Sequence, residues 1–523
     1  MTFLALMAIA PILVVFVMLI RNVSTLLTSI VGWSLCVLSA LIFFDTSISV
    51  SLRASLATVF QSFPFTLMII SSILLITFME STGAIRRISV FIKTLAPTNQ
   101  VAQLMTINLG VGTTLVSVGA TPVSILPPIM KSKGYSNFMS IALPGMGYDA
   151  LCTYSMLAAP LVVYSDIAGI SLVEAAKIFA LYLPAISTGI CFGMLYLAGG
   201  TALMKKGFRP ALISGLTAAF TAIAIAYIPF LNAGIVLTGV IAGGLVLLVN
   251  ILMLKLKGVP IIDRSVLNEE DLQIEKGMSL FTALSPITIL IVSLLFVNFV
   301  KPVNDLLMVK LAMPISIIPG QEIKLRMLWN AYTFMVVSVI LSAICIKPTK
   351  SQIKETLSIW LKRFPTPFIT ATVFFALALL MSNTGLEPVG SVWKVVDPTK
   401  NMISVFAMET ARIIGAAYPF ITAPLGLFGS FVSSSEGSTL AMFAKYNIIA
   451  AEELGLNALV VTAGTGIGAG LGSLVAPGKL QNAAAVIDAI GEEQAVLKKL
   501  FPICLVLVAL TSVVCFILTK IIT

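Results

Sequence analysis

The sequence predicts an all-α polytopic membrane protein with about 12 transmembrane helices and two re-entrant hairpins. Three observations support this prediction: an apolar composition, recurring apolar runs of membrane-spanning length, and a break near the middle of two such runs. Of the 523 residues, 58% are hydrophobic and 10% are charged. Soluble domains have roughly 25% charged residues. Because so few polar side chains cannot cover so large a core in water, we expect the surface to face lipid.

Helices that cross the hydrocarbon core of a bilayer need about 20 consecutive apolar residues. The first 20 residues lack a basic start and a small-residue cleavage site, which indicates a retained first span rather than a signal peptide. The predicted spans are residues 3–20, 25–44, 62–79, 138–163, 178–199, 211–230, 234–254, 279–300, 327–346, 365–382, 456–476 and 500–521.

Two further apolar stretches, 101–131 and 418–446, are broken by Gly, Pro, Ser and Thr. Most of the 32 Lys and Arg residues fall on one side of the membrane when Arg21 is placed in the cytoplasm. That arrangement puts both termini outside, and it requires each broken stretch to enter and leave on the same side. Irregular backbone at membrane depth needs surrounding protein or a water-filled cavity, so both stretches are expected to be re-entrant hairpins.

The order of elements is the same in two parts of the chain, with opposite orientation. Three spans, an amphipathic linker (80–99 or 400–416), a hairpin and two further spans follow one another in each part. This pattern is typical of inverted-repeat transporters. We therefore expect a first repeat at 1–199, a connecting helix pair and charged cytoplasmic linker at 200–278, and a second repeat at 279–523.

Both hairpins are rich in small and hydroxyl-bearing residues near the expected turn. Half-helix N-termini at such turns offer N–H groups and a positive dipole end to an anion. Close helix packing by small residues is the alternative explanation. The candidate substrate-binding residues are Thr113, Thr114, Ser117, Gly119 and Thr121 in the first hairpin, and Ser433, Ser434, Ser435, Gly437 and Ser438 in the second.

Asp149 and Glu436 lie within predicted membrane segments, where ionisable residues are costly and often functional, and Lys479 follows the break at 476–478. Asp149 and Glu436 are the candidate proton carriers, because removal from water favours the neutral form of a carboxyl group. Lys479 is a candidate partner for a carboxylate substrate, or it extends toward the membrane interface. Carboxylates and unwound carbonyls also bind Na⁺, so Na⁺-coupled uptake or cation/proton antiport stays open as an alternative.

Other functional classes have little support. The chain has no His, and its six Cys residues are scattered, so neither a metal site nor another cofactor is predicted. A phosphate-binding loop of the Gly-x4-Gly-Lys-[Ser/Thr] type is absent from the sequence, which argues against ATP-driven transport. No nucleophile stands beside a base, as an enzyme would need, and no filter sequence repeats, as a channel would suggest. The net charge of +10 is explained by membrane topology and not by nucleic-acid binding.

At the same residues the sequence resembles the L-lactate permease family of bacterial and archaeal carriers. Segment 429–438 resembles that family's Gly-x-Phe-hydroxyl-Gly-Ser-acid-x-x-Ser motif, and 443–455, 468–477 and 483–493 continue the resemblance in register. Segment 118–125 resembles the family's Gly-Phe-Gly-[Ala/Thr]-Pro-Val-Ala-Ile more loosely, followed by 167–170 and 183–184. The resemblance implies an elevator-type carrier with scaffold and transport domains. It also implies proton-coupled uptake of 2-hydroxy monocarboxylates such as L-lactate, D-lactate and glycolate.

Two departures from the family pattern fall at the candidate site. Val116-Ser117 stands where the family has Glu-Gly, and Tyr148-Asp149-Ala150-Leu151 replaces Asn-Thr-Ala-Pro. We hypothesise that Asp149 takes over the carboxyl group missing from the first hairpin. The expected partners are a small organic anion, protons (with Na⁺ as the alternative), the lipid bilayer and a second copy in a homodimer. The expected location is the cytoplasmic membrane of a prokaryote.

Overall fold

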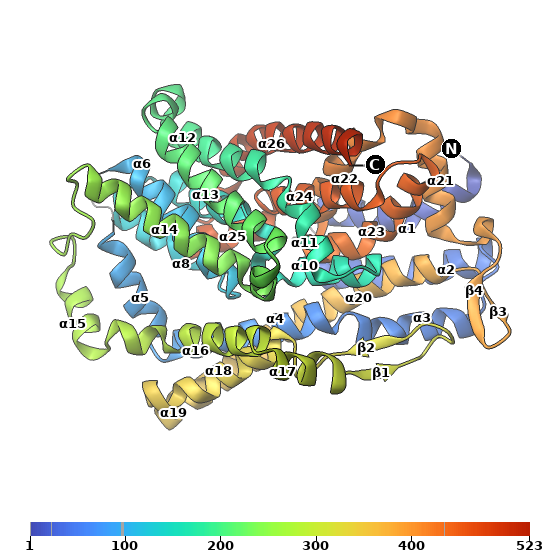
Figure 1. The fold of residues 1–523 in the computed structure, drawn as a ribbon, viewed down its shortest axis with the longest axis horizontal. Helices are drawn as coiled ribbons and strands as arrows, with labels where there is room; N and C mark the ends of the chain where they lie inside the picture. The colour runs from blue at the N-terminus through green and yellow to red at the C-terminus, as the bar shows by residue number, and fades with distance from the viewer. Residues whose placement is uncertain (1, 22, 96–98, 434, 523) are drawn as a thin grey trace.

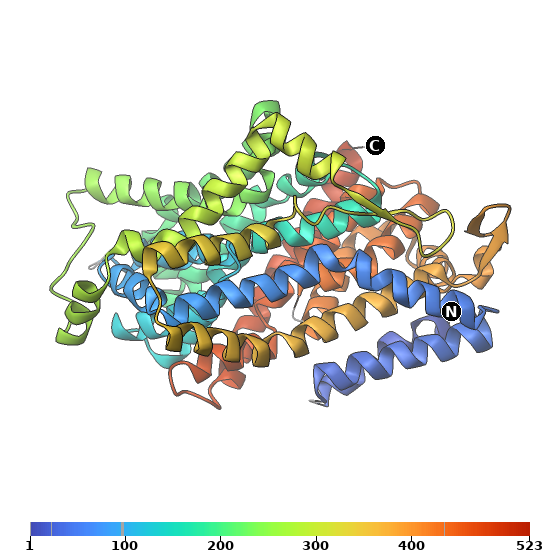
Figure 2. The same ribbon diagram turned by 90° about the horizontal axis from the view of Figure 1, so that it is seen from below.

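The computed structural model describes residues 2–21, 23–95, 99–433 and 435–522 as a mostly helical molecule whose long helices run side by side (Figures 1 and 2). In this described part, 10 helical stretches are long and apolar enough to cross a membrane, or 11 if a bent pair is counted as one span. Two of the 12 predicted spans, 3–20 and 327–346, correspond to shorter apolar helices, Phe3–Leu19 and Ala331–Ile346. Both chain ends lie toward one end of the molecule, and α15 lies at the other (Figure 1).

The elements of the first part follow in chain order. They are α1 Phe3–Ile20, α2 Thr25–Phe43, α3 Ile48–Gln61, α4 Phe63–Ser81, α5 Ala84–Lys93, α6 Gln100–Gln103, the π-helix η1 Leu104–Val111, α7 Gly112–Ser117, α8 Pro122–Ser132, α9 Asn137–Asp149, the 3-10 helix η2 Cys152–Tyr154, α10 Ser155–Ala168, α11 Leu172–Ala180 and α12 Leu183–Lys206.

The connecting pair and the second part complete the chain. Their elements are α13 Phe208–Tyr227, η3 Pro229–Leu237, α14 Thr238–Leu256, α15 Glu269–Gly277, α16 Leu280–Phe299, α17 Lys301–Asn304, η4 Asp305–Lys310, β1 Met313–Ile315, β2 Ile323–Leu325, α18 Ala331–Ile346, α19 Lys350–Arg363, α20 Pro365–Asn383, β3 Leu386–Val389, β4 Val392–Val395, η5 Pro398–Lys400, α21 Met402–Ile414, η6 Gly415–Ala417, α22 Tyr418–Ser433, α23 Glu436–Glu453, α24 Ala458–Ser473, α25 Pro477–Ala485 and α26 Glu493–Ile521.

Both broken stretches fold as helical hairpins. In the first, Asn108 of η1 donates to the Met130 sulfur of α8 at 3.6 Å, on the far side of a turn at residues 118–121. In the second, the Tyr418 hydroxyl at the start of α22 donates to Asn447 of α23 at 2.9 Å. The contact in the first hairpin joins residues 22 positions apart in the sequence, and the contact in the second joins residues 29 positions apart. The two arms of each hairpin therefore run antiparallel.

The predicted span 138–163 is wrong as a single straight helix. Instead, α9 ends at Asp149, and η2 and α10 continue at an angle of 75°. Pro160 has no N–H and its ring clashes with the carbonyl four residues earlier, at Met156. Met156, Leu157 and Ala158 accordingly have positive φ angles. The predicted span 456–476 likewise ends early at Ser473, and Pro477 then begins α25.

The described structure is mostly helical, as predicted, and it adds two small antiparallel hairpins, β1–β2 and β3–β4, which the sequence did not predict. They contact each other, because the N–H of Trp393 on β4 donates to the carbonyl of Pro319 at 2.8 Å. The predicted helices also omitted α3 and α19, which directly precede α4 and α20 (Figure 1).

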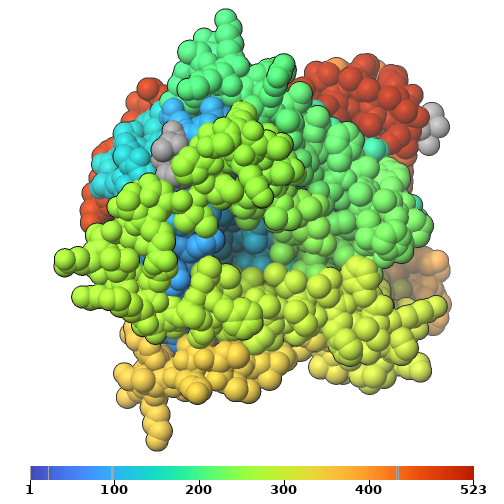
Figure 3. All heavy atoms as spheres, turned by 60° about the vertical axis from the view of Figure 1, so that its left-hand side comes forward, coloured from blue at the N-terminus to red at the C-terminus, as the bar shows by residue number. Residues whose placement is uncertain are grey.

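The linker between α14 and α16 contains α15, and it arches over a hollow at one end of the molecule (Figure 3). Two ion pairs attach α15 to α5, from Lys93 to Asp271 at 2.7 Å and from Arg87 to Glu275 at 3.0 Å. The charged linker is therefore docked on the amphipathic segment before the first hairpin, rather than being a free loop.

The second hairpin packs against α24 with almost no space between the two helices. A Cβ atom on Gly426 would overlap the carbonyl oxygen of Thr465, and one on Gly468 would overlap the carbonyl oxygen of Ala423. Small residues allow this backbone approach, which gives dense van der Waals contact within a membrane. The hairpin and α24 thus form one tightly packed unit.

Gly468→Ala is expected to destabilise the protein, because the added methyl group meets backbone that cannot rotate away. Overpacking of this kind costs about 1–3 kcal/mol. The midpoint temperature of unfolding in detergent measures the effect. Gly244→Ala is the matched control: this helical glycine in α14 has open space, so alanine there should leave the midpoint unchanged or raise it. Equal midpoints for the two variants would contradict the packing argument.

Candidate functional site

The candidate site lies where the second hairpin meets two broken helices. One break separates α9 from α10 at residues 150–154, and the other separates α24 from α25 at 474–476. The hairpins engage these breaks reciprocally: α23 packs against α10, and α8 packs against α25. The second arm of each hairpin, α8 or α23, therefore packs beside a helix break from the other part of the chain.

Glu436 begins α23 at the turn of the second hairpin. Ser435 is the N-cap, and its hydroxyl accepts from the Ser438 N–H at 3.3 Å. Glu436 is only 3% exposed, and its Oε1 accepts from the Thr153 hydroxyl at 2.7 Å. The second oxygen, Oε2, accepts no hydrogen bond from the described residues. It lies beside Gly470, where a Cβ atom would stand 3.1 Å away.

Asp149 ends α9 on the other side of the same region. Its Oδ1 accepts from the Ser473 hydroxyl at 2.8 Å, while Oδ2 is buried without a hydrogen-bond partner in the described part of the chain. Asp149, Glu436 and Lys479 lie within electrostatic range of one another. The half-buried Lys479 places its ammonium nitrogen 5.2 Å from the centroid of the Tyr148 ring.

The other residues predicted in the second hairpin surround Glu436 or support its turn. The Ser433 hydroxyl donates to the Ser435 carbonyl at 3.0 Å and so closes the turn. Ser438 is buried, and Gly437 lies against Phe65 of α4. Ser434 lies outside the described residues.

In the described structure, the first hairpin's predicted residues form no hydrogen bond with Glu436, Asp149 or Lys479, although α7 contacts η2. The hydroxyls of Thr114 and Ser117 donate to carbonyls of their own helix at 2.9 and 2.6 Å, and they pack against Gly243 and Gly239 of α14. Gly119 adopts a φ of +85° at the turn and lies near Ser72 of α4. For these residues the structure favours close helix packing, the alternative that the sequence left open.

Two further first-hairpin residues differ in their surroundings. Thr113 is 1% exposed, and its hydroxyl has no hydrogen-bond partner in the described structure. Thr121 is exposed at the N-terminus of α8 and makes no side-chain cap. Thr113 thus has a free hydroxyl inside the protein, as does Thr106 of the same hairpin, which the sequence did not single out.

Sequence reasoning missed Thr153 and Ser473, the hydroxyl partners of the two carboxyl groups. Each lies at a helix break. Thr153 is 283 residues from Glu436 in the sequence, and Ser473 is 324 residues from Asp149. The signal available was Gly-rich and Pro-bounded sequence around Ser473. A comparable signal precedes Thr153, since Pro144, Gly145 and Gly147 lie just before its break, but the prediction of one straight span passed over it.

The site combines two buried carboxyl groups, hydroxyl donors and one ammonium group. Carboxyl groups with one free oxygen each can exchange a proton, and the ammonium group can hold a small carboxylate. No group of three or more His, Cys, Asp or Glu suited to a metal ion occurs among the described residues. The chemistry of the site therefore matches binding of protons and small anions.

The chain matches the family model described as L-lactate permease over residues 4–522. An L-lactate permease from Streptococcus iniae is 21% identical over 466 residues, which cover 87% of this chain and 92% of that protein. An L-lactate permease from Escherichia coli K12 is 25% identical over 161 residues, or 31% of this chain and 26% of that protein. A solved structure of the Neisseria gonorrhoeae efflux pump MtrF aligns over 90% of this chain and 84% of its own, with 11% identity and a TM-score of 0.46.

Proposed function

Because the chain belongs to the L-lactate permease family, we propose that it transports small 2-hydroxy monocarboxylates such as L-lactate across the cytoplasmic membrane, together with protons. The observation that supports this most directly is the pairing of Glu436 with Thr153 and of Asp149 with Ser473 at helix breaks, beside Lys479. D-lactate and glycolate share the carboxylate and the 2-hydroxyl group, so they belong to the same substrate class.

The proposed binding mode uses the free hydrogen-bonding groups around Glu436. The substrate carboxylate pairs with the Lys479 ammonium group. The Thr153 and Ser473 hydroxyls already donate to the two carboxyl groups, so their oxygens accept from the substrate's 2-hydroxyl group. Glu436 and Asp149 take up the coupled protons. Each has one oxygen without a hydrogen-bond partner in the described structure, and that oxygen can accept a proton without breaking an existing bond.

The direct test is lactate-driven alkalinisation outside proteoliposomes that contain the purified chain. Inward movement of lactate with a proton should raise the external pH, and a panel of 2-hydroxy acids should compete. Replacement of Na⁺ by choline at a constant proton gradient distinguishes the Na⁺-coupled alternative. Absence of any pH change with the whole panel would refute proton-coupled uptake of this class.

We further propose that the repeats at 1–199 and 279–523 are inverted and form an elevator-type carrier around the connecting pair. Reciprocal packing supports this: α4 contacts α18 and α19, while α20 contacts α2 and α3. In this proposal the hairpins with α9, α10, α24 and α25 carry the substrate. The segments α1–α4 and α16–α20 form the scaffold.

Asp149→Asn is expected to flatten the dependence of uptake on external pH. The amide keeps the Ser473 hydrogen bond but removes one group that can bind a proton near Glu436 and Lys479. Initial L-lactate uptake across a series of external pH values, at fixed internal pH, measures the effect. A pH profile that coincides with that of the unchanged protein would exclude Asp149 from coupling.

A further inference from the structure

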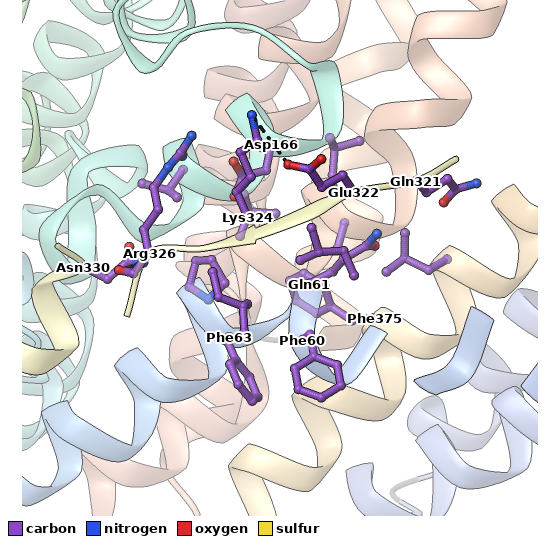
Figure 4. Close-up of a pocket in the computed structure, with 18 of the residues that line it drawn as sticks. Phe60, Gln61, Phe63, Asp166, Gln321, Glu322, Lys324, Arg326, Asn330 and Phe375 are labelled. Carbon is purple, nitrogen blue, oxygen red and sulfur yellow. Dashed lines mark hydrogen bonds and ion pairs between the residues drawn. The ribbon is translucent and has the colours of Figure 1, made fainter. Parts of the chain in front are cut away.

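A pocket of about 480 Å³ lies apart from the buried carboxyl groups, between the scaffold and the second hairpin. Its walls come from the junction of α3 and α4, from β2, α10 and α20, and from α23. Glu322, Lys324 and Arg326, along β2 and directly on either side of it, alternate with Ile323 and Leu325, so the charged side chains project to one face. Figure 4 shows Glu322, Lys324, Arg326 and Asp166 on one side of β2. Phe60 and Phe63 lie on the other side of the strand.

Among the charged side chains that line this pocket, the positive ones outnumber the negative ones by one. Lys324 pairs with Glu322 at 3.7 Å, and Arg326 interacts with Asp166. Lys445 of α23 also lines the pocket, and it forms no ion pair with any described residue. An anion bound here would therefore complete the charge balance.

Two N–H groups at the pocket point to the same ligand chemistry. The Arg326 Nε and the indole Nε1 of Trp329 are buried, and neither has an acceptor among the described residues. Trp329 is 8% exposed. Buried donors without acceptors cost free energy unless a ligand or water occupies the site. A carboxylate offers the two acceptor oxygens that such donors need.

The pocket is continuous with the turn of the second hairpin along one face of α23. Gly437, Ala441 and Lys445 follow at intervals of four residues, so they lie in a row on that helix. Ala441 and Lys445 line the pocket, while Gly437 is next to Glu436 in the chain. Phe65 covers this end of the row: a Cβ atom on Gly437 would lie 2.6 Å from its ring. Phe65 stacks on the pocket residue Phe375, with centroids 5.8 Å apart.

We propose that this pocket is an outer capture site for a small carboxylate, which binds there before it passes Phe65 to the region of Glu436. Arg326, Lys445 and the Trp329 N–H bind the carboxylate, and Phe375, which stacks on Phe65, lies on the way to Glu436. The identity of the anion as a 2-hydroxy acid rests on the proposed function. The charge pattern predicts that the connection holding β2 lies outside the cell, where a substrate for uptake arrives.

The transport test compares Arg326→Gln and Lys445→Gln with the unchanged protein in proteoliposomes. Initial uptake of labelled L-lactate should show a KM raised by about tenfold for each variant, because the cations concentrate the anion at the entrance. The maximal rate should stay close to that of the unchanged protein. Lys394→Gln is the matched control, since this exposed cation on β4 does not line the pocket. An unchanged KM for both pocket variants would overturn the proposal.

A binding test separates this proposal from the proposed function. In the full chain with Trp33, Trp360 and Trp393 replaced by Phe, only Trp329 fluoresces at tryptophan wavelengths. L-lactate should change that fluorescence saturably, and Arg326→Gln should remove the response. Normal lactate transport without a Trp329 response would overturn the capture site alone. A saturable, Arg326-dependent response in a protein that transports no 2-hydroxy acid would overturn the proposed function alone.

Discussion

Glu436→Gln is expected to abolish uphill uptake of L-lactate driven by a proton gradient. The amide has nearly the same shape and can still accept from the Thr153 hydroxyl, but it cannot exchange a proton. Glu436 is buried against Thr153 and Gly470, whereas Asp149, the other carboxyl group of the region, is held by Ser473 and does not occupy the position of Glu436. Accumulation of labelled lactate in proteoliposomes with an imposed pH gradient should fall to background.

Counterflow provides the internal control for this variant. Exchange of external labelled lactate for internal lactate needs substrate binding and movement of the site, but no net proton transfer. Glu436→Gln should therefore keep counterflow while it loses accumulation. Thr153→Val, which removes the hydroxyl that orients Glu436, should weaken accumulation without abolishing it. Loss of counterflow together with accumulation would instead assign Glu436 to substrate binding or to folding.

The sequence predicted the helical hairpins well because their signal is local. Small and hydroxyl-bearing residues interrupt an apolar run where the chain turns, at 118–121 and directly before Glu436. The sequence predicted the break after Asp149 poorly. That break lies among contacts with distant segments, such as that of Thr153 with Glu436, and Pro160 bears only on the separate deviation at Met156 to Ala158 inside α10. The β1–β2 hairpin was missed because its strands have only three residues each.

The candidate site was predicted in part. Asp149, Glu436 and Lys479 were identified as ionisable residues in apolar surroundings, and they lie within electrostatic range of one another. Their hydroxyl partners depend on contacts between distant segments, which no local pattern encodes. The role of the first hairpin's Thr114 and Ser117 likewise depends on the glycines of α14, which bring that helix into contact with them. Composition alone cannot distinguish a hydroxyl that binds substrate from one that packs against a neighbouring helix.

Lys479→Gln is expected to weaken binding of L-lactate by about 10- to 100-fold. A hydrogen bond to a charged group contributes about 1.5–3 kcal/mol, and each 1.4 kcal/mol corresponds to about a tenfold change in affinity. The KM for counterflow reports this loss without interference from proton coupling. Lys498→Gln is a suitable control, because that lysine lies near the start of α26 and is exposed.

The same measurement can separate two roles of Lys479, because the lysine also lies near Asp149. If its main role is to neutralise Asp149, then Asp149→Asn should restore lactate affinity to the Lys479→Gln variant. If Lys479 holds the substrate carboxylate, the double variant should bind lactate as weakly as Lys479→Gln alone. A double-mutant cycle on KM, with unfolding midpoints recorded for all four proteins, measures this coupling directly. Full restoration of affinity in the double variant would rule out a direct contact between Lys479 and the substrate, and it would leave the hydroxyl and N–H donors of the second hairpin to bind the carboxylate.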